Sequence, residues 1–179
     1  MTLHSVLAVR CDTDLLLHHL AGIGLAASRG TALLVDLDPA SPSYPGRLTV
    51  ADLVRDGLRK ADLAPSKKGV AVLGNGGADI ERAVELVDAL AEGWPAVAVR
   101  AGSDPLPYPV VPVVPAFPAA WGIEAEGAVR QPVMRAGIEG GLVLPVLRRG
   151  QVQSMLAGRV RPAWRWVRAW SQVWERPWG

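Results

Sequence analysis

"VLAVRCDTDLLLHHLAGIGLAASRGTALLVDLDP", residues 6–39, contains two short apolar runs with a longer helical pattern between them. The two runs, at residues 5–10 and 31–38, are rich in valine and leucine and lack polar alternation, which is typical of strands buried on both faces. Between them, apolar residues recur at the three-to-four spacing of a helix: Leu15, Leu16, Leu20, Ile23 and Ala27. The order strand, helix, strand predicts a parallel pair of strands joined by a crossover helix.

The same alternation continues along the chain. Apolar runs at residues 69–76 and 95–102 predict two further strands, and helical patterns cover residues 49–58 and 80–91. We therefore expect one three-layer α/β domain, with a mainly parallel sheet flanked by helices.

The second half of the chain is harder to assign. Residues 105–118, PLPYPVVPVVPAFP, hold six prolines in fourteen positions, which predicts an edge strand or an extended connector at the rim of the sheet rather than a central strand. Residues 140–147 are the last strand candidate, and a helical turn or two should follow over residues 148–158.

Composition limits the function. The 179 residues are 50% hydrophobic, which suits a single domain. One cysteine, Cys11, rules out an internal disulfide framework, and no apolar run reaches the roughly 18 residues of a membrane span. We expect a cytoplasmic protein, and its many alanine, glycine, arginine and proline residues with few lysines indicate a bacterial source.

The sequence from residue 3 to about residue 115 resembles the ParA/MinD superfamily of deviant P-loop ATPases, including its pilus-localisation branch, the CpaE/TadZ-like proteins. The resemblance is carried by the first strand, by AASRG at residues 26–30, and by LLVDLDP at residues 33–39. It implies a P-loop NTPase-like fold and a protein that dimerises. It also implies that Asp36 and Asp38 lie near a magnesium ion and the attacking water.

The resemblance fails at the phosphate-binding loop. The family motif K-G-G-x-G-K-[ST] holds phosphates with backbone amides, a lysine and a hydroxyl group. Residues 10–19 read RCDTDLLLHH, with Asp12 and Asp14 where the phosphates would lie, and a carboxylate there would repel an anion. The strand at residues 95–102 also presents Arg100 where the resemblance implies an aspartate near magnesium. The sequence therefore predicts a pseudo-ATPase with no catalytic residue, no metal and no cofactor.

Other candidate sites have simpler interpretations. Asp36 and Asp38 are residual candidates for a metal or nucleotide contact, but we favour a solvated turn before Pro39. The turn GNGGAD at residues 74–79 is interpreted as structural, with Asp79 capping the next helix. Cys11 lacks the partners of a nucleophile, and the three histidines have no spacing typical of zinc, so we interpret them as solvated or core-edge residues: His4, His18 and His19.

The C-terminal segment has an unusual composition. Residues 148–179 contain seven arginines and one acid, Glu175, so the preceding 147 residues carry a formal charge of −4. Five of the seven tryptophans fall in the last sixteen residues. A helix over residues 163–176, with Pro162 in its first turn and Pro177 ending it, places the following residues on one arc: Ala163, Trp166, Val167, Trp170, Val173 and Trp174.

Four partners are compatible with that arc. The favoured one is the protein's own sheet; the others are an anionic membrane surface, another protein chain, and nucleic acid, which the acidic body disfavours. The candidate partner or membrane surface consists of Trp164, Trp166, Trp170, Trp174, Arg165 and Arg168. We expect residues 1–158 to form the ParA/MinD-like domain and residues 159–179 to add the Trp/Arg-rich amphipathic helix.

The function that we expect is that of a non-catalytic scaffold or regulator, acting through protein–protein interaction in a bacterial positioning, division, partition or pilus-type assembly. A homodimer, or a heterodimer with an active relative, is the expected state. The alternatives are a nucleotide-binding ATPase whose site is completed by a partner chain, and a MinD-like protein peripheral at the inner membrane.

Overall fold

The computed structural model describes residues 4–59, 62–117, 127–134 and 141–178. The elements, in chain order, are β1 (Val6–Arg10), α1 (Leu15–Ala27), β2 (Thr31–Leu37), α2 (Val50–Asp56), β3 (Gly69–Leu73), α3 (Ile80–Ala91), β4 (Val97–Ala101), β5 (Val110–Ala116), β6 (Val129–Pro132), β7 (Leu142–Val143), α4 (Arg149–Leu156), α5 (Arg165–Ala169) and the 3-10 helix η2 (Trp170–Val173). None of the helices in these ranges is long and apolar enough to cross a bilayer.

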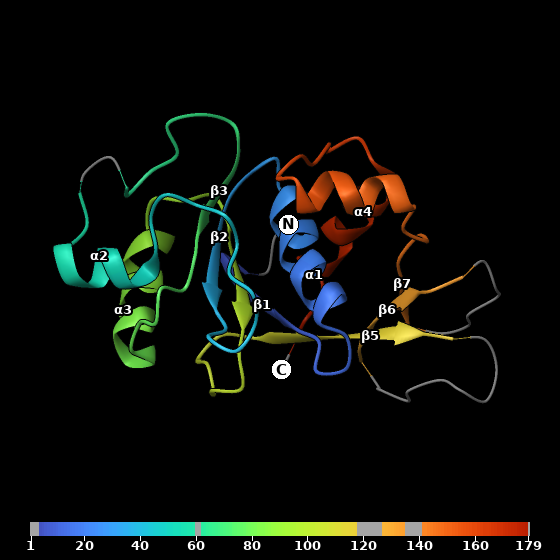
Figure 1. Cartoon of the computed structure of the whole chain (residues 1–179), viewed down its shortest axis with the longest axis horizontal. Coiled ribbons are helices and arrows are strands. Elements are labelled where there is room, and N and C mark those ends of the chain that lie inside the picture. Colours follow the sequence, from blue (N-terminus) through green and yellow to red (C-terminus); the bar gives the residue numbers. More distant parts are fainter. Residues whose placement is uncertain (1–3, 60–61, 118–126, 135–140, 179) are drawn as a thin grey trace.

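The strands form one sheet of seven, in the order β3-β2-β4-β1-β5-β6-β7, and every described pair is parallel. Helices α2 and α3 lie on one side of the sheet, and α1 and α4 lie on the other (Figure 1). The prediction of an α/β fold with a mainly parallel sheet flanked by helices is confirmed.

The apolar strands feed two separate cores because successive side chains of a strand point to opposite faces. On one face, Leu7, Val9 and Leu34 pack with α1 and the C-terminal segment. On the other face, Ala8 and Val35 pack with α2 and α3. Strands β1, β2 and β4 are buried along nearly their whole length, which explains why their sequences show no polar alternation.

Polar side chains fix the beginnings of the helices. Asp14 accepts a hydrogen bond from the Leu17 amide at the start of α1, and Asp79 caps α3 through the Arg82 amide, as predicted. Thr49 and Asp52 form a reciprocal capping box at α2.

The proline-rich stretch forms an interior strand, so the prediction that it lies at the rim is wrong. β5 lies between β1 and β6, and its two ladders are staggered: residues 110–112 pair with β1, and residues 113–116 pair with β6. Pro112 and Pro115 therefore each lie in only one ladder, and a missing N–H affects one side of the strand at a time. β6, which no sequence pattern predicted, and the two-residue β7 complete this side of the sheet.

The terminal helix is shorter than the predicted residues 163–176. α5 has five residues, and its backbone passes into the 3-10 helix η2 at Trp170. The Ser171 hydroxyl donates to the Arg168 carbonyl at 2.7 Å, and a serine side chain that takes a helix carbonyl in this way competes with the regular backbone ladder. The final turn, η2, has the tighter 3-10 geometry.

Candidate functional site

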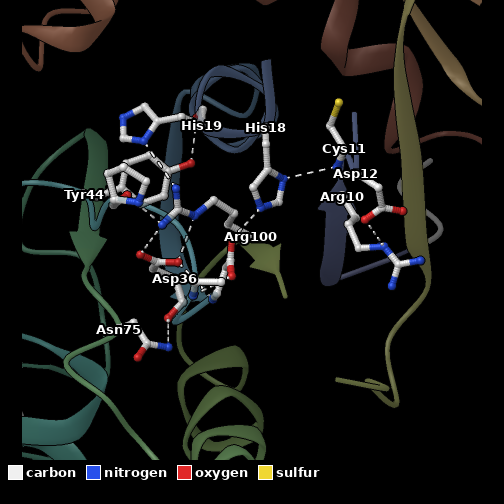
Figure 2. A network of polar contacts seen from close by, with 12 residues as sticks. Arg10, Cys11, Asp12, His18, His19, Asp36, Tyr44, Asn75 and Arg100 are labelled. Atoms are coloured by element: carbon white, nitrogen blue, oxygen red, sulfur yellow. Dashed lines mark hydrogen bonds and ion pairs between the residues drawn. The ribbon is translucent and has the colours of Figure 1, made fainter. Parts of the chain in front are cut away.

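The first candidate site lies where the strand order reverses. The chain leaves β1 through α1 to reach β2 on one side, and it later passes from β4 to β5 on the other side of β1. In open α/β sheets, ligands bind in the crevice at the carboxyl ends of the strands at such a point. Here the carboxyl ends of β2 and β4 carry a polar network that involves α1 and the segment after β2 (Figure 2).

The centre of the network is an ion pair between Asp36 and Arg100. The two residues are direct neighbours across the β2–β4 ladder, and neither side chain is exposed to solvent. Arg100 Nε donates to Asp36 Oδ1 at 2.9 Å, and Arg100 Nη2 donates to Asp36 Oδ2 at 2.6 Å. This two-point contact matches the planar guanidinium to the carboxylate and makes the pair geometrically specific.

The remaining surface of the guanidinium is also occupied. Nη2 donates to the Pro42 carbonyl at 2.9 Å, and the Arg100 guanidinium carbon lies 4.5 Å from the ring centroid of Tyr44. Burial raises the pKa of Asp36, and the hydrogen bonds and charge of Arg100 oppose that rise. The carboxylate is ionised at neutral pH, because both of its oxygens accept from a guanidinium that cannot lose its proton.

His18 ties the loop after β1 to the end of β2. The Cys11 amide donates to His18 Nδ1 at 3.2 Å, so Nδ1 is unprotonated, and Nε2 carries the proton toward Asp38 Oδ2 at 3.1 Å. Burial and the nearby charge of Arg100 lower the pKa of His18. Burial alone would raise the pKa of Asp38, but hydrogen bonds from Ser41 and from the Ala40 amide lower it. His18 is thus a neutral bridge.

His19 and Tyr44 complete the network. Nη1 of Arg100 lies 3.3 Å from His19 Nδ1, and because arginine only donates, this nitrogen is an acceptor and the ring is neutral. Burial, together with the charge of Arg100, lowers the pKa of His19 to about 4. The Tyr44 hydroxyl donates to the His19 carbonyl at 2.7 Å, and burial raises its pKa far above the usual value.

Asp36 and Asp38 are therefore not in the predicted solvated turn. Their exposed fractions are 0% and 6%, because Arg100 neutralises the first carboxylate and His18 covers the second. Sequence reasoning interpreted His18 and His19 as solvated or core-edge residues, and it did not connect either of them to Arg100. The signal in the sequence that could have indicated this network was the pair of histidines at the start of a helix that follows a buried strand.

The loop after β1 does not fit the phosphates of a nucleotide. The Asp14 carboxylate accepts the Leu17 amide at 2.9 Å, so a negative side chain already occupies the anion-favouring end of α1. The Cys11 amide is directed to His18, and Asp12 forms an exposed ion pair with Arg10.

The site does not fit a magnesium ion either. The guanidinium of Arg100 lies against the Asp36 carboxylate, where a cation would bind. Within the ranges that the structure describes, no group of three or more His, Cys, Asp or Glu side chains is arranged to hold a metal ion.

The second candidate site is the C-terminal segment. Trp166, Trp170 and Trp174 have exposed fractions of 1%, 0% and 0% and belong to the same core cluster as α1 and the strands. Trp166 donates to Gln131 Oε1 at 2.6 Å, and Trp174 donates to the Leu25 carbonyl at 3.1 Å. These three side chains do not form the partner or membrane surface that was one hypothesis, because they pack inside the protein.

The rest of that predicted surface remains accessible. Trp164 is half-buried, and Arg165 and Arg168 are exposed. Trp164 and Arg165 also line a pocket of about 490 Å³, with Arg148 and Gln151 contributed by the start of α4. Comparisons with known protein families, with curated proteins and with solved structures found no significant match to this chain.

Proposed function

We propose that this chain is a pseudo-ATPase: a P-loop NTPase-like domain related to the ParA/MinD superfamily that acts without catalysis, as a scaffold or regulator. It would act through protein–protein interaction in a bacterial positioning, division, partition or pilus-type assembly. A homodimer, or a heterodimer with an active relative, is the state that follows from the resemblance.

The observation that carries the proposal is the buried Asp36–Arg100 pair at the reversal of strand order. Phosphoryl transfer depends on positioning and electrostatic stabilisation of the phosphates. In this crevice the cationic group is already bound by a carboxylate through two hydrogen bonds and has no exposed surface. Breaking this ion pair would leave a buried charge without its partner, which costs about 3–5 kcal/mol.

The loop supports the same conclusion independently. Asp14 takes a helix amide that a phosphate would need, and His18 takes the amide of Cys11. Asp14 and His18 therefore occupy backbone amides that a phosphate would need.

A phosphate-release assay with magnesium and ATP tests the absence of catalysis. The full chain should release phosphate no faster than buffer does, and the Asp36→Asn variant should behave identically. Turnover that Asp36→Asn abolishes while the protein stays folded would contradict the proposal, because it would assign Asp36 a catalytic role.

A further inference from the structure

The pocket at Trp164 combines positive charge with a rigid apolar wall. Its lining, which we call the arginine pocket, consists of Pro145, Val146, Arg148, Gln151, Ala163, Trp164, Arg165 and Trp166. Its volume of about 490 Å³ lies within the range of sites that bury a small ligand or a large side chain. No carboxylate is present among these residues.

The surroundings of the arginine pocket are equally basic. Seven exposed arginines lie in the C-terminal segment, and none of them forms an ion pair with a described residue: Arg148, Arg149, Arg159, Arg161, Arg165, Arg168 and Arg176. The only acid in this segment is Glu175. The terminal arginines are therefore available to an external anion.

The apolar wall is held in place by the core. Trp166 is 1% exposed and its Nε1 donates to Gln131 Oε1 at 2.6 Å, so it is fixed in the core, and the accessible apolar surface of the pocket comes from the half-buried Pro145, Val146 and Trp164. The Trp164 amide donates to the Arg161 carbonyl at 3.1 Å, which fixes the chain just before α5. A preformed pocket reduces the entropic cost of binding.

We propose that the arginine pocket binds an acidic segment of a partner protein. One apolar side chain of that segment enters the pocket against Trp164, and flanking carboxylates pair with Arg148 and Arg165. This inference rests on the proposed function, since it names the chemistry of the partner that a non-catalytic scaffold would bind. Tryptophan and arginine are the residues most enriched at the energetic centres of protein interfaces.

A membrane and a nucleic acid fit this surface less well. Among residues 141–178, Leu156 is the one large hydrophobic side chain that is substantially exposed, at 48%, while Trp166, Trp170 and Trp174 are buried. A bilayer would meet guanidinium groups without an apolar wedge to insert. A long polyanion would extend beyond the pocket over residues 1–147, whose formal charge is −4.

Fluorescence anisotropy with the full chain tests the inference. The probe is a short fluorescein-labelled peptide of glutamates around one central phenylalanine. We expect saturable binding that Arg165→Glu weakens by about tenfold or more, the loss expected when charge-assisted hydrogen bonds are removed. Arg82→Glu is the matched control: it makes the same exposed change on α3, across the sheet, and should leave the affinity unchanged.

Two further arms separate the alternatives. A peptide with glycine in place of phenylalanine should bind more weakly if the pocket accepts an apolar anchor. Vesicles of phosphatidylglycerol, and a single-stranded oligonucleotide, should bind more weakly than the phenylalanine peptide. Absent peptide binding, equal loss with Arg82→Glu, or tighter binding of vesicles or oligonucleotide would overturn the inference. None of these outcomes bears on nucleotide binding, so the pseudo-ATPase proposal fails or survives separately.

Discussion

Arg100 occupies the crevice at the ends of β2 and β4 with a buried positive charge. It lies in a strand of small apolar residues, at a register position directly opposite Asp36, and its side chain is fully buried. A buried charge persists only with a partner that neutralises it and satisfies its hydrogen bonds, and Asp36, Pro42 and His19 together do this.

Replacing one member of this pair should lower the free energy of unfolding much more than replacing both. Arg100→Met leaves the Asp36 carboxylate buried without its partner, and we expect a loss of about 3–5 kcal/mol in the free energy of unfolding. Arg100→Met combined with Asp36→Leu replaces the pair by apolar groups and should be clearly more stable than Arg100→Met alone. Urea denaturation of the four proteins in this double-mutant cycle measures the coupling, and additive losses would contradict a dependent pair.

His19 should make folding stability depend on pH. Its pKa is lowered from 6.5 to about 4 in the folded chain, so the unfolded chain binds a proton in this window while the folded chain does not. Above pH 6.5 both states are neutral at His19 and the free energy of unfolding is unaffected by its titration. As the pH falls toward 4, the unfolded chain takes up the proton and the free energy of unfolding decreases. The lowered pKa of His18 acts in the same direction.

His19→Gln should therefore reduce the slope of unfolding free energy against pH across this window. His4→Gln, outside the network, should retain that slope because His18 and His19 stay in place. Urea titrations at a series of pH values provide the comparison. An unchanged slope in His19→Gln would show that His19 is not held neutral by the fold.

The sequence named Asp36, Asp38 and Arg100 individually but could not join them. Asp36 and Arg100 are 64 positions apart, and their contact depends on β4 pairing with β2 in one register. A strand pattern identifies a strand, but neighbours and register are set by the packing of the whole sheet.

Among the helices and strands, apolar patterns in the sequence predicted correctly those elements that have one face or both faces buried. Strands β1 to β4 lie within the predicted stretches because each is an apolar run without polar alternation, and helices α1, α2 and α3 do so because their apolar residues recur at helical spacing. The position of β5 in the sheet was predicted wrongly. The number of prolines shows how many backbone N–H donors are missing, but not which neighbouring strand would have accepted from them. The predicted helix over residues 163–176 was wrong because the spacing of apolar residues tests the direction of side chains and not the backbone hydrogen bonds.

Close packing of α1 against the terminal segment depends on Gly24. A Cβ added there would lie 2.6 Å from a ring carbon of Trp166 and would also meet Trp170 Nε1. Gly24→Ala should lower the unfolding free energy by about 1–3 kcal/mol, the usual cost of overpacking, although alanine favours helices.

Gly150→Ala, in α4, is the matched control because a Cβ at that position meets no atom within 4 Å. This variant should be as stable as the original chain or more stable by up to about 1 kcal/mol. Thermal and urea unfolding measure both variants. Equal effects of the two substitutions would show that the tryptophans do not pack closely on α1.

At the scale of the whole molecule, the two sides of the sheet differ in charge. The exposed acids Glu81, Glu85 and Asp88 belong to α3, and the exposed Arg149 belongs to α4, on the opposite side of the sheet (Figure 1). The sequence predicted that residues 148–179 are basic and the preceding residues net acidic, but not that the two kinds of charge lie on opposite sides of the sheet. It also placed Trp166, Trp170 and Trp174 on one arc of a helix. The protein's own sheet was the favoured cover for these three tryptophans, and in the structure they pack in one core cluster with the sheet and α1.

We propose that the crevice at the ends of β2 and β4 is filled by the protein's own side chains and binds no nucleotide. Isothermal titration calorimetry of magnesium–ATP into the full chain tests it most directly. We predict no saturable heat up to about 1 mM ATP, a limit that corresponds to a binding free energy weaker than about −4 kcal/mol. Saturable binding that requires magnesium and is lost in Asp36→Asn would contradict the claim.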